Sequence, residues 1–447
     1  MTTYRQRVAE IERRLGGRRL VFFGTRGTDA RPLLEISNFE EVFSQIAPLE
    51  AVSIQETCLE TIKKERVDLN AYSIDSDTSA AVLELRDHLL RAFGRPSAVI
   101  PYRPCAVLTS ACFARANLVR YLGLFHEKQS AFEHKPWMET QLAAAGVRVL
   151  PWGYYADEDK ALILEAAATG PFVLRINRSD GGFGLTLLHD PGQLHHVWPQ
   201  HLDGFLAAAP LLVPSIPLNV GACVFPGGGI SLHPPSLQLI GLRACTNRPF
   251  GYCGNDFARI GDLDREILEE LERITIVVGA WLGSQGYLGA FGIDALVFDG
   301  EVYLVEVNPR FQGCSLLSAA ICRELDRPDI FLDHMAAFLA LPPPPRIGLH
   351  AFSRCQPKVA HVACHNLLAR HVHPAPDLPK AHPIASPLFP GPGVAVAPEG
   401  ILFDARFQEA VTDGGFELYR AVERQLEPPL EEIYLPAPKT SAQGDLF

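Results

Sequence analysis

Two acids and one amide stand at hairpin spacing in the segment 289–313, namely Asp294, Glu306 and Asn308. Their carboxylate and amide oxygens suit Mg²⁺, a hard cation that also takes phosphate oxygens and water, so the cluster could hold a nucleotide. A lone acidic pair is more often solvated on an exposed sheet face. Here apolar residues flank both acids on both parities, which indicates strands buried on both faces, where an acid needs a partner.

A β-hairpin must position these side chains. Two runs rich in β-branched and aromatic residues lie on either side of residues 298–300, which predicts two antiparallel strands. A two-residue Asp-Gly turn would put Asp294 on the face opposite the other two polar side chains. A three-residue loop with Gly300 left-handed would pair Val297 with Glu301 and bring all three to one face. We expect this second register.

The run G-x-D-A-L-V-F-D-G-E-V-Y-L-V-E-V-N-P-R, residues 292–310, resembles the magnesium-binding hairpin of the ATP-grasp ligases. In that family an acid, followed by acid-x-Asn-x-Arg, holds two Mg²⁺ against the phosphates of ATP. The resemblance implies that Asp294, Glu306 and Asn308 bind the metal. It implies that Arg310 stabilises charge on the transferred group and on the tetrahedral oxyanion.

Two upstream cations fit the same family pattern. Lys135 opens a predicted helix that ends at Gly146, before a predicted strand at 147–151, and this resembles the segment with a phosphate-contacting lysine. Arg175 stands where the family usually has a second phosphate lysine. An arginine keeps the charge but offers a planar fork of donors, so its geometry differs from that of a lysine. A surface lysine is the alternative for Lys135.

A glycine-rich loop follows the strand predicted at 171–177. Its residues are Ser179, Asp180, Gly181, Gly182, Phe183 and Gly184, and it leads into the next predicted strand, 185–188. Glycine permits unusual dihedral angles and close approach of the backbone, so its N–H groups can lie over phosphates. The setting resembles the flexible phosphate lid of ATP-grasp enzymes, and a structural turn is the alternative.

Residues 211–217 occupy the place of the hinge strand whose backbone recognises adenine in the family. Proline has no backbone N–H, so Pro214 moves the expected contacts to Val213, Ser215 or Ile216. Asn219 is the candidate contact for the ribose. Polar residues crowd the predicted loop 243–256. There Arg243 is a candidate contact for phosphate or a substrate carboxylate, and a solvated arginine is the alternative.

Composition narrows the function classes. The chain has 447 residues, 47% hydrophobic and 20% charged, which is typical of a soluble multidomain protein. A net charge of −11 gives no basic footprint for nucleic acid. Ten cysteines without a CxxC pair fit reduced thiols, and no window of eighteen apolar residues predicts a membrane span. We expect a cytoplasmic protein that binds neither nucleic acid nor membrane.

The expected fold class is α/β and α+β multidomain, with an ATP-grasp fold. An N-terminal α/β pre-ATP-grasp domain is predicted at 1–110 and the ATP-grasp domain at 111–341. After a polyproline run, a small C-terminal α+β domain is predicted at 346–435, with a strand pair in 391–404 and a helix at 408–425. Residues 436–447 are predicted to be disordered. His361 and His365 would share a helical face, but no third zinc ligand has a recognisable pattern.

The resemblance implies an ATP-dependent, magnesium-dependent ligase. A substrate carboxylate would attack the γ-phosphate of ATP to give an acyl phosphate, and an amine, from an amino acid or peptide, would then form an amide and release ADP and phosphate. The divergent hinge, Arg175 and the appended C-terminal domain resemble the peptide ligases of natural-product pathways, of the pheganomycin type. A homodimer is common in the family. Two alternatives stay open: transfer to a thiol of a carrier protein or coenzyme A, and a nucleotide-binding module without catalysis.

Overall fold

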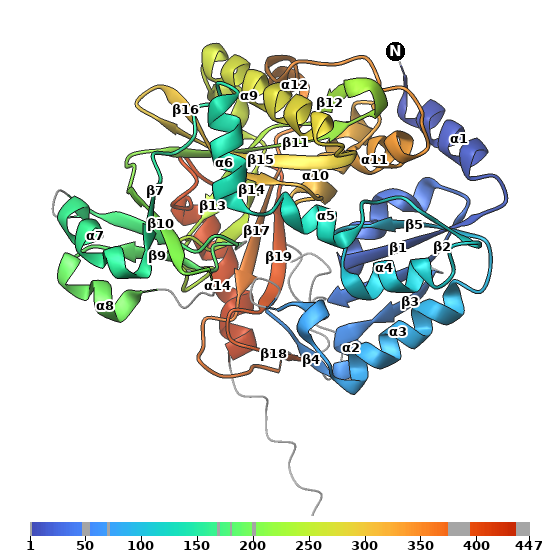
Figure 1. Ribbon diagram of the computed structural model, residues 1–447, viewed down its shortest axis with the longest axis horizontal. Coiled ribbons are helices and arrows are strands. Elements are labelled where there is room, and N and C mark those ends of the chain that lie inside the picture. Colours follow the sequence, from blue (N-terminus) through green and yellow to red (C-terminus); the bar gives the residue numbers. More distant parts are fainter. Residues whose placement is uncertain are drawn as a thin grey trace, which may run out of the picture.

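The computed structural model describes residues 2–46, 54–68, 72–167, 170–178, 181–198, 203–373 and 394–434. Three sheets of four or more strands organise these residues (Figure 1). The predicted tail, 436–447, lies outside the described residues, and so do residues 374–393. Mixed helices and strands agree with the predicted α/β and α+β class.

The N-terminal sheet is fully parallel, in the order β3-β2-β1-β5-β6. Its strands are β1 (Arg19–Arg26), β2 (Phe39–Ile46), β3 (Gln55–Cys58), β5 (Ser97–Pro101) and β6 (Val119–Tyr121). Its helices are α1 (Tyr4–Leu15), α2 (Leu59–Lys63), α3 (Ala80–Ala92) and α4 (Ala106–Phe113), and the 3₁₀ helices η1 (Gly27–Glu35) and η2 (Ile74–Ser76) connect them. Parallel strands need such crossovers, which place helices on the faces of the sheet.

A small antiparallel sheet forms the lobe at the left of Figure 1, in the order β7-β10-β8-β9. It consists of β7 (Gly153–Ala156), β8 (Phe172–Arg175), β9 (Leu185–Leu188) and β10 (Phe205–Pro210), with η3 (Asp157–Asp159), α7 (Lys160–Ala167), η4 (Pro191–Gln193) and α8 (Leu194–Val197). The strand predicted at 147–151 is wrong. An isolated bridge between Val149 and Leu304 lies there instead.

The large sheet is antiparallel and has the order β16-β15-β11-β13-β14-β17-β19, with β12 beside β11. The strands are β11 (Ile216–Val224), β12 (Ile230–Leu232), β13 (Ser236–Ile240), β14 (Tyr252–Asp256), β15 (Gly289–Phe298), β16 (Glu301–Asn308), β17 (Ala360–His365) and β19 (Ile401–Phe407). The loop predicted at 243–256 is therefore wrong at its end. Residues 252–256 pair with both β13 and β17 as a central strand.

Helices cover this sheet on both faces. They are α5 (His126–Ala131), α6 (Lys135–Ala144), α9 (Arg265–Ser284), α10 (Ser315–Glu324), α11 (Ile330–Phe338) and α12 (Leu349–Cys355), with η5 (Pro226–Gly228) and η6 (Arg259–Asp262) in the connections. The apolar side of α9 packs in one core cluster with alternate residues of β11 and β15, such as Val220 and Ile293. The opposite face carries Asn219 and Asp294, because side chains alternate along a strand.

The predicted hairpin exists, but its predicted register is wrong. Val297 pairs with Val302, and the turn is the two-residue Asp299-Gly300, both with positive φ. Such a turn twists in the sense of the flanking strands, which favours it over a three-residue loop. A β-bulge at Val305 then shifts the pairing, so that Asp294 lies opposite Glu306. The three polar side chains therefore share one face, as expected, for a different reason.

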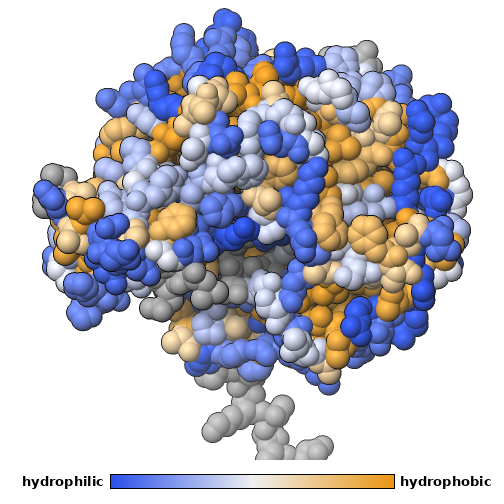
Figure 2. All heavy atoms as spheres, in the orientation of Figure 1, coloured by the Kyte–Doolittle hydropathy of each residue, from blue (hydrophilic) through white to orange (hydrophobic). Residues whose placement is uncertain are grey.

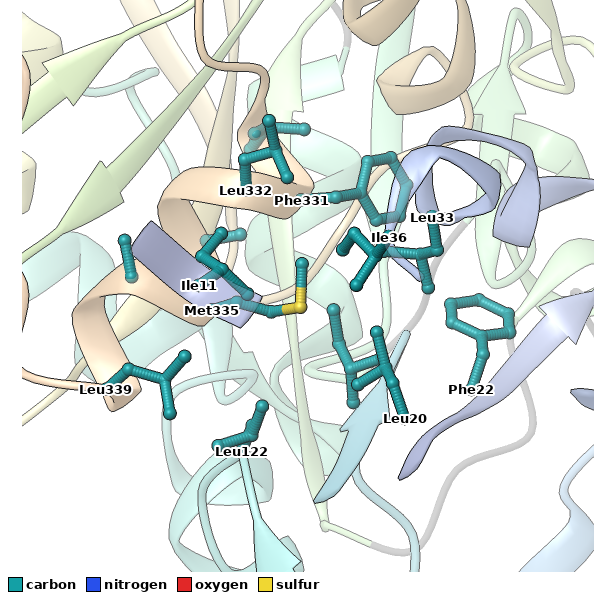
Figure 3. Close-up of a cluster of buried hydrophobic side chains, with 14 of the residues drawn as sticks. Ile11, Leu20, Phe22, Leu33, Ile36, Leu122, Phe331, Leu332, Met335 and Leu339 are labelled. Atoms are coloured by element: carbon teal, nitrogen blue, oxygen red, sulfur yellow. The ribbon is translucent and has the colours of Figure 1, made fainter. Parts of the chain in front are cut away.

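An apolar core joins the N-terminal sheet to the large sheet. Figure 3 shows Ile11 of α1, Leu20 of β1 and Met335 of α11 pointing toward one another, and these side chains are fully buried. The same cluster reaches Cys223 of β11 and Ala290 of β15. The core therefore holds the N-terminal sheet against one end of the face that carries Asp294.

The segment beyond the polyproline run extends the large sheet. β17 pairs with β14, and β19 pairs with β17, so the sheet crosses the predicted domain boundary at 341–346. The predicted strand pair in 391–404 is wrong, because β18 (Ala395–Val396) pairs with β4 (Glu65–Arg66) of the N-terminal part. The helix predicted at 408–425 is wrong over residues 408–419, which are not helical, because α14 spans Arg420–Tyr434.

His361 and His365 lie on strand β17 and not on a helix. Across the described ranges, no helix has both the length and the apolar character that a membrane crossing requires.

Candidate active site

The central feature of the site is the pair of facing carboxylates on β15 and β16. Asp294 and Glu306 are direct partners in the register, and Asn308 follows on the same face. The Asn308 Nδ2 donates a hydrogen bond to Asp294 Oδ2 at 3.0 Å. Two acids and an amide oxygen are thus held side by side by strand pairing, in the arrangement expected from the sequence.

Buried amides hold the Asp294 carboxylate in place. Asn219 Nδ2 donates to Asp294 Oδ1 at 2.6 Å, and Gln312 Nε2 donates to the same oxygen at 3.2 Å. Cys314 Sγ donates in turn to Asn219 Oδ1 at 3.0 Å. Burial raises the pKa of the Cys314 thiol to about 12, so this cysteine acts in packing and hydrogen bonding and not as a thiolate.

The two acids perturb each other. Burial and the negative charge of Glu306 raise the pKa of Asp294 to about 6, although the neighbouring amides and Arg310 act in the opposite direction. A raised pKa means that the folded protein disfavours a second negative charge at this position. A cation between the two carboxylates would remove that penalty.

Lys135 reaches this pair from α6, where it is the first helical residue. Its Nζ forms an ion pair with Glu306, and its side chain is 8% exposed. Its backbone N–H donates to the carbonyl of Asn177, which follows β8. A surface lysine is therefore the wrong description. A pocket beside the pair is lined by residues of α6 and β16, among them Lys135, Met138, Glu139, Val305 and Glu306.

Arg175 lies deeper than a phosphate contact requires. It forms a bidentate ion pair with Glu139 of α6, and its NH2 to Oε2 distance is 2.8 Å. The guanidinium also lies over the ring of Trp152, 4.2 Å from the centroid. Tyr154 donates to the same carboxylate at 2.6 Å. The expected contact of Arg175 with phosphate stays a prediction, because the guanidinium here is bound by protein groups.

The glycine-rich loop is described from Gly181 onward, whereas Ser179 and Asp180 lie outside the described residues. Gly181, Gly182 and Gly184 all have positive φ. A Cβ on Gly182 would come within 2.0 Å of the Phe250 carbonyl oxygen, so only glycine fits there. Phe183 is 44% exposed at the turn. The loop has the glycine geometry expected of a lid, and its contact with phosphate stays a prediction.

Of the expected hinge strand, 211–217, residues 211–215 form a connection between β10 and β11, and the strand begins only at Ile216. Val213 is 61% exposed, and Ser215 and Ile216 are partly exposed. Their backbone contacts to adenine stay predictions. Asn219, the expected ribose contact, forms hydrogen bonds with other side chains of the protein. It is 2% exposed, and its amide serves Asp294 and Cys314.

The two candidate catalytic arginines differ in position. Arg310 lies two residues after the end of β16, donates to the Phe311 carbonyl at 3.1 Å, and is close enough to Asp294 to lower its pKa. Arg243 is exposed, and no contact joins it to this cluster among the described residues. The structure thus brings Arg310, but not Arg243, to the carboxylates.

Sequence reasoning missed two residues of the cluster, Gln312 and Glu139. Gln312 stands two residues after Arg310, so its closeness to the acids was readable from the hairpin. Glu139 lies one turn after Lys135 on α6, and this helical spacing places both side chains on one face. Its role appears only when β8 packs against α6.

The described residues contain no group of three or more His, Cys, Asp and Glu side chains that could hold a metal. The candidate metal site therefore rests on two carboxylates and the Asn308 amide, a donor set that leaves room for water and phosphate oxygens around Mg²⁺.

Comparison with known proteins agrees with this geometry. The family model described as the ATP-grasp domain matches residues 234–314, which include β15, β16 and the segment to Cys314. No curated protein matches the sequence.

Solved structures resemble the whole chain at low identity. N5-carboxyaminoimidazole synthetase from Staphylococcus aureus, complexed with ADP, is 13% identical with a TM-score of 0.57, over 92% of this chain and 97% of that one. Biotin carboxylase from Campylobacter jejuni, in a β-γ-ATP complex, is 13% identical with a TM-score of 0.57, over 93% and 91%. Carboxyaminoimidazole ribonucleotide synthase from Aspergillus clavatus, complexed with ATP, is 13% identical with a TM-score of 0.57, over 93% and 98%.

Proposed function

We propose that this protein, which has the ATP-grasp fold, is an ATP-dependent ligase that activates a carboxylate as an acyl phosphate and couples it to an amine. The products are an amide, ADP and phosphate. The amine belongs to an amino acid or a peptide, as in the natural-product peptide ligases that the sequence resembles. We also propose that the protein is cytoplasmic and forms a homodimer.

One observation carries the proposal: strand pairing and the Val305 bulge place Asp294 and Glu306 face to face, with Asn308 and Lys135 beside them. A nucleotide site that had lost its catalytic function would not require two facing acids, one of them with a raised pKa. The similar structures, a synthetase with ADP, a synthase with ATP and a biotin carboxylase with β-γ-ATP, support the same class of reaction.

The charges of Asp294 and Glu306 make the site suitable for Mg²⁺. Asp294 accepts two amide hydrogen bonds at one oxygen and lies against a second acid, so a divalent cation supplies the charge that the pair lacks. Glu306 and the Asn308 oxygen would complete the protein ligands. When bound, the ion would neutralise the phosphate charge that develops during transfer.

The protein groups then divide the work. Lys135 and the loop 181–184 bind phosphate, Lys135 by exchanging its ion pair with Glu306 for a phosphate oxygen. Arg310 stabilises negative charge on the transferred group and on the tetrahedral oxyanion that forms when the amine attacks. Phosphoryl transfer needs positioning and charge neutralisation more than covalent participation, and none of these residues forms a covalent intermediate.

The test is release of ADP and phosphate from Mg-ATP, with carboxylic acids and amines offered in pairs from amino acids, guanidino acids and short peptides. We expect release only when both partners and Mg²⁺ are present, and loss of release in Glu306→Ala. Glu301→Ala is the matched control, because Glu301 lies on the same strand but is 53% exposed and paired with Arg148.

Two other outcomes decide between the alternatives. ADP release that yields a thioester on an added carrier protein, seen by mass, would replace the amine with a thiol. ATP binding without ADP release from any pair, even with hydroxylamine as acceptor, would overturn the proposal in favour of a nucleotide-binding module.

A further inference from the structure

A second pocket lies at the meeting point of three parts of the chain, and no step proposed above uses it. Arg26 comes from the end of β1, and His361, Asp404 and Arg406 come from β17 and β19. Gly313, Leu316 and Leu317, at the start of α10, complete the lining. In Figure 2 the visible face is hollowed near its centre, and hydrophilic residues form the upper rim of this hollow.

The strand register puts this pocket on the same sheet face as the candidate metal site. Partners across the sheet form a polar row that consists of Glu306, Asp294, Asn219, Ser236, Gln238, Asn255, His361 and Arg406. Directly paired residues share a face, as do residues two apart on one strand, such as Ser236 and Gln238. The polar row therefore runs from one site to the other.

The segment after β16 links the two sites as well. Gln312 donates to Asp294 at the metal site. The next residue, Gly313, lines the second pocket, and its carbonyl accepts a hydrogen bond from Arg26 NH2 at 3.0 Å. A Cβ on Gly313 would lie 2.7 Å from the Tyr252 hydroxyl, so the segment passes close against β14. A molecule in this pocket would therefore contact the same segment that holds the carboxylate of Asp294.

The pairing of the charged side chains in the pocket determines which of them a ligand can bind. Arg26 pairs with Asp29 at 2.9 Å, and His361 Nδ1 lies 3.1 Å from Asp404. Both acids thus have partners. Burial raises the pKa of Asp404, but His361, Arg406 and Arg26 outweigh it and hold this pKa below its ordinary value.

Arg406 differs from the other charged residues that line this pocket. It lines the pocket, its side chain is exposed, and it makes no side-chain hydrogen bond or ion pair within the described part of the chain. Its fork of N–H donors matches a carboxylate. Leu316 and Leu317 offer apolar surface beside it. The pocket is therefore suited to an anionic group carried on an aliphatic body.

We propose that this pocket binds the C-terminal carboxylate of a peptide whose amine is the acceptor, with Arg406 as the residue that contacts it. The inference rests on the proposed function and names its amine substrate. Four strand spacings separate Asp294 from His361, roughly 19 Å at about 4.8 Å each. An extended chain of about five residues has this length, whereas one free amino acid does not. The far end of a short peptide reaches the pocket while its amine stays at the hairpin.

The experiment compares five- and six-residue peptide acceptors that end in a free carboxylate with the same peptides ending in an amide. In the wild-type protein we expect the carboxylate to lower KM at least about 10-fold, with kcat within about twofold. In Arg406→Gln this preference disappears, and Arg406→Lys restores part of it. Arg424→Gln, an exposed arginine on α14, is the matched control and keeps the preference.

Three results would overturn the inference: a wild-type enzyme indifferent to the C-terminal group, a preference that survives in Arg406→Gln, or tighter binding of a phosphonate-ended peptide. Hydroxylamine-dependent ADP release needs no peptide, so its absence marks failure of the proposed function alone. In that case calorimetric binding of the two peptide series to wild type and Arg406→Gln still tests the pocket.

Discussion

Two groups of polar residues lie along the same large sheet, and both contain an acid with a raised pKa. Asp294 has a pKa of about 6, raised first by burial and then by Glu306, and Asp333 of α11 has a pKa of about 7, raised by burial. Asp294 is partly exposed, accepts three amide hydrogen bonds and faces Glu306 beside a pocket. Asp333 is fully buried, and neither of its oxygens has a hydrogen-bond partner among the described residues.

The difference shows that a perturbed pKa does not by itself mark a functional site. The neighbour of Asp333 is His233, whose Nε2 lies 3.5 Å away and whose pKa burial lowers to about 3. A second acid, Asp329, lies close enough for Asp333 to raise its pKa, but neither of the two pockets described above is lined by Asp333 or His233. What distinguishes Asp294 is convergence of charged side chains on a position that solvent reaches.

The largest expected effect is on Asp294→Asn. We expect ADP release to fall at least about 100-fold, because the metal site loses a negative ligand. The melting temperature should hold or rise, because the mutation removes a partly buried charge next to another acid. Steady-state assays and thermal unfolding measure the two effects. A lower melting temperature with full activity would make Asp294 structural, like Asp333, and break the comparison.

Glu139→Gln tests the inner part of the active site. Arg175 would keep its charge but lose its bidentate partner, at a cost of roughly 3–5 kcal/mol in the free energy of unfolding. Chemical denaturation measures this change. The control is Glu270→Gln, which breaks the exposed pair with Arg273 and should cost no more than about 1 kcal/mol. Equal losses in the two variants would show that the pair is not a buried one.

Asp333→Asn should change the pH dependence of stability. The unfolded acid loses its proton near pH 4, whereas the folded acid keeps it until about pH 7. The stability that protonated Asp333 contributes is complete below pH 4 and is lost as the pH rises toward and beyond 7. Melting temperatures from pH 5 to 8 should therefore fall more steeply in the wild type than in Asp333→Asn. Parallel curves would contradict the assignment, and activity should be unchanged.

The smallest effect is expected for Arg243→Gln. This exposed side chain is separate from the carboxylates, so kcat and KM should stay within about twofold in the ADP release assay. A loss of tenfold or more would show that the turn at 243–246 closes onto substrate, and would restore Arg243 to the site.

Much of the fold was readable from local patterns. The strands predicted at 171–177 and 185–188 and both arms of the hairpin are confirmed, because each has its own pattern of apolar residues and its own turn residues. The C-terminal strands were harder. β18 pairs with β4, some 330 residues away in sequence, and β14 is a central strand only because β17 lies beside it. Such pairing has no local signal.

The sequence by itself determined which chemistry this chain carries: oxygen ligands for Mg²⁺, a lysine at a helix start, and glycines where backbone must approach closely. These follow from residue type and short spacing. Only the tertiary structure decided how the groups meet. The Val305 bulge sets Asp294 opposite Glu306. The packing of α6 brings Glu139 into its ion pair with Arg175. The addition of β17 and β19 to the sheet places Arg406 in the polar row. Long-range pairing depends on the summed packing of the whole chain, and no single segment encodes it.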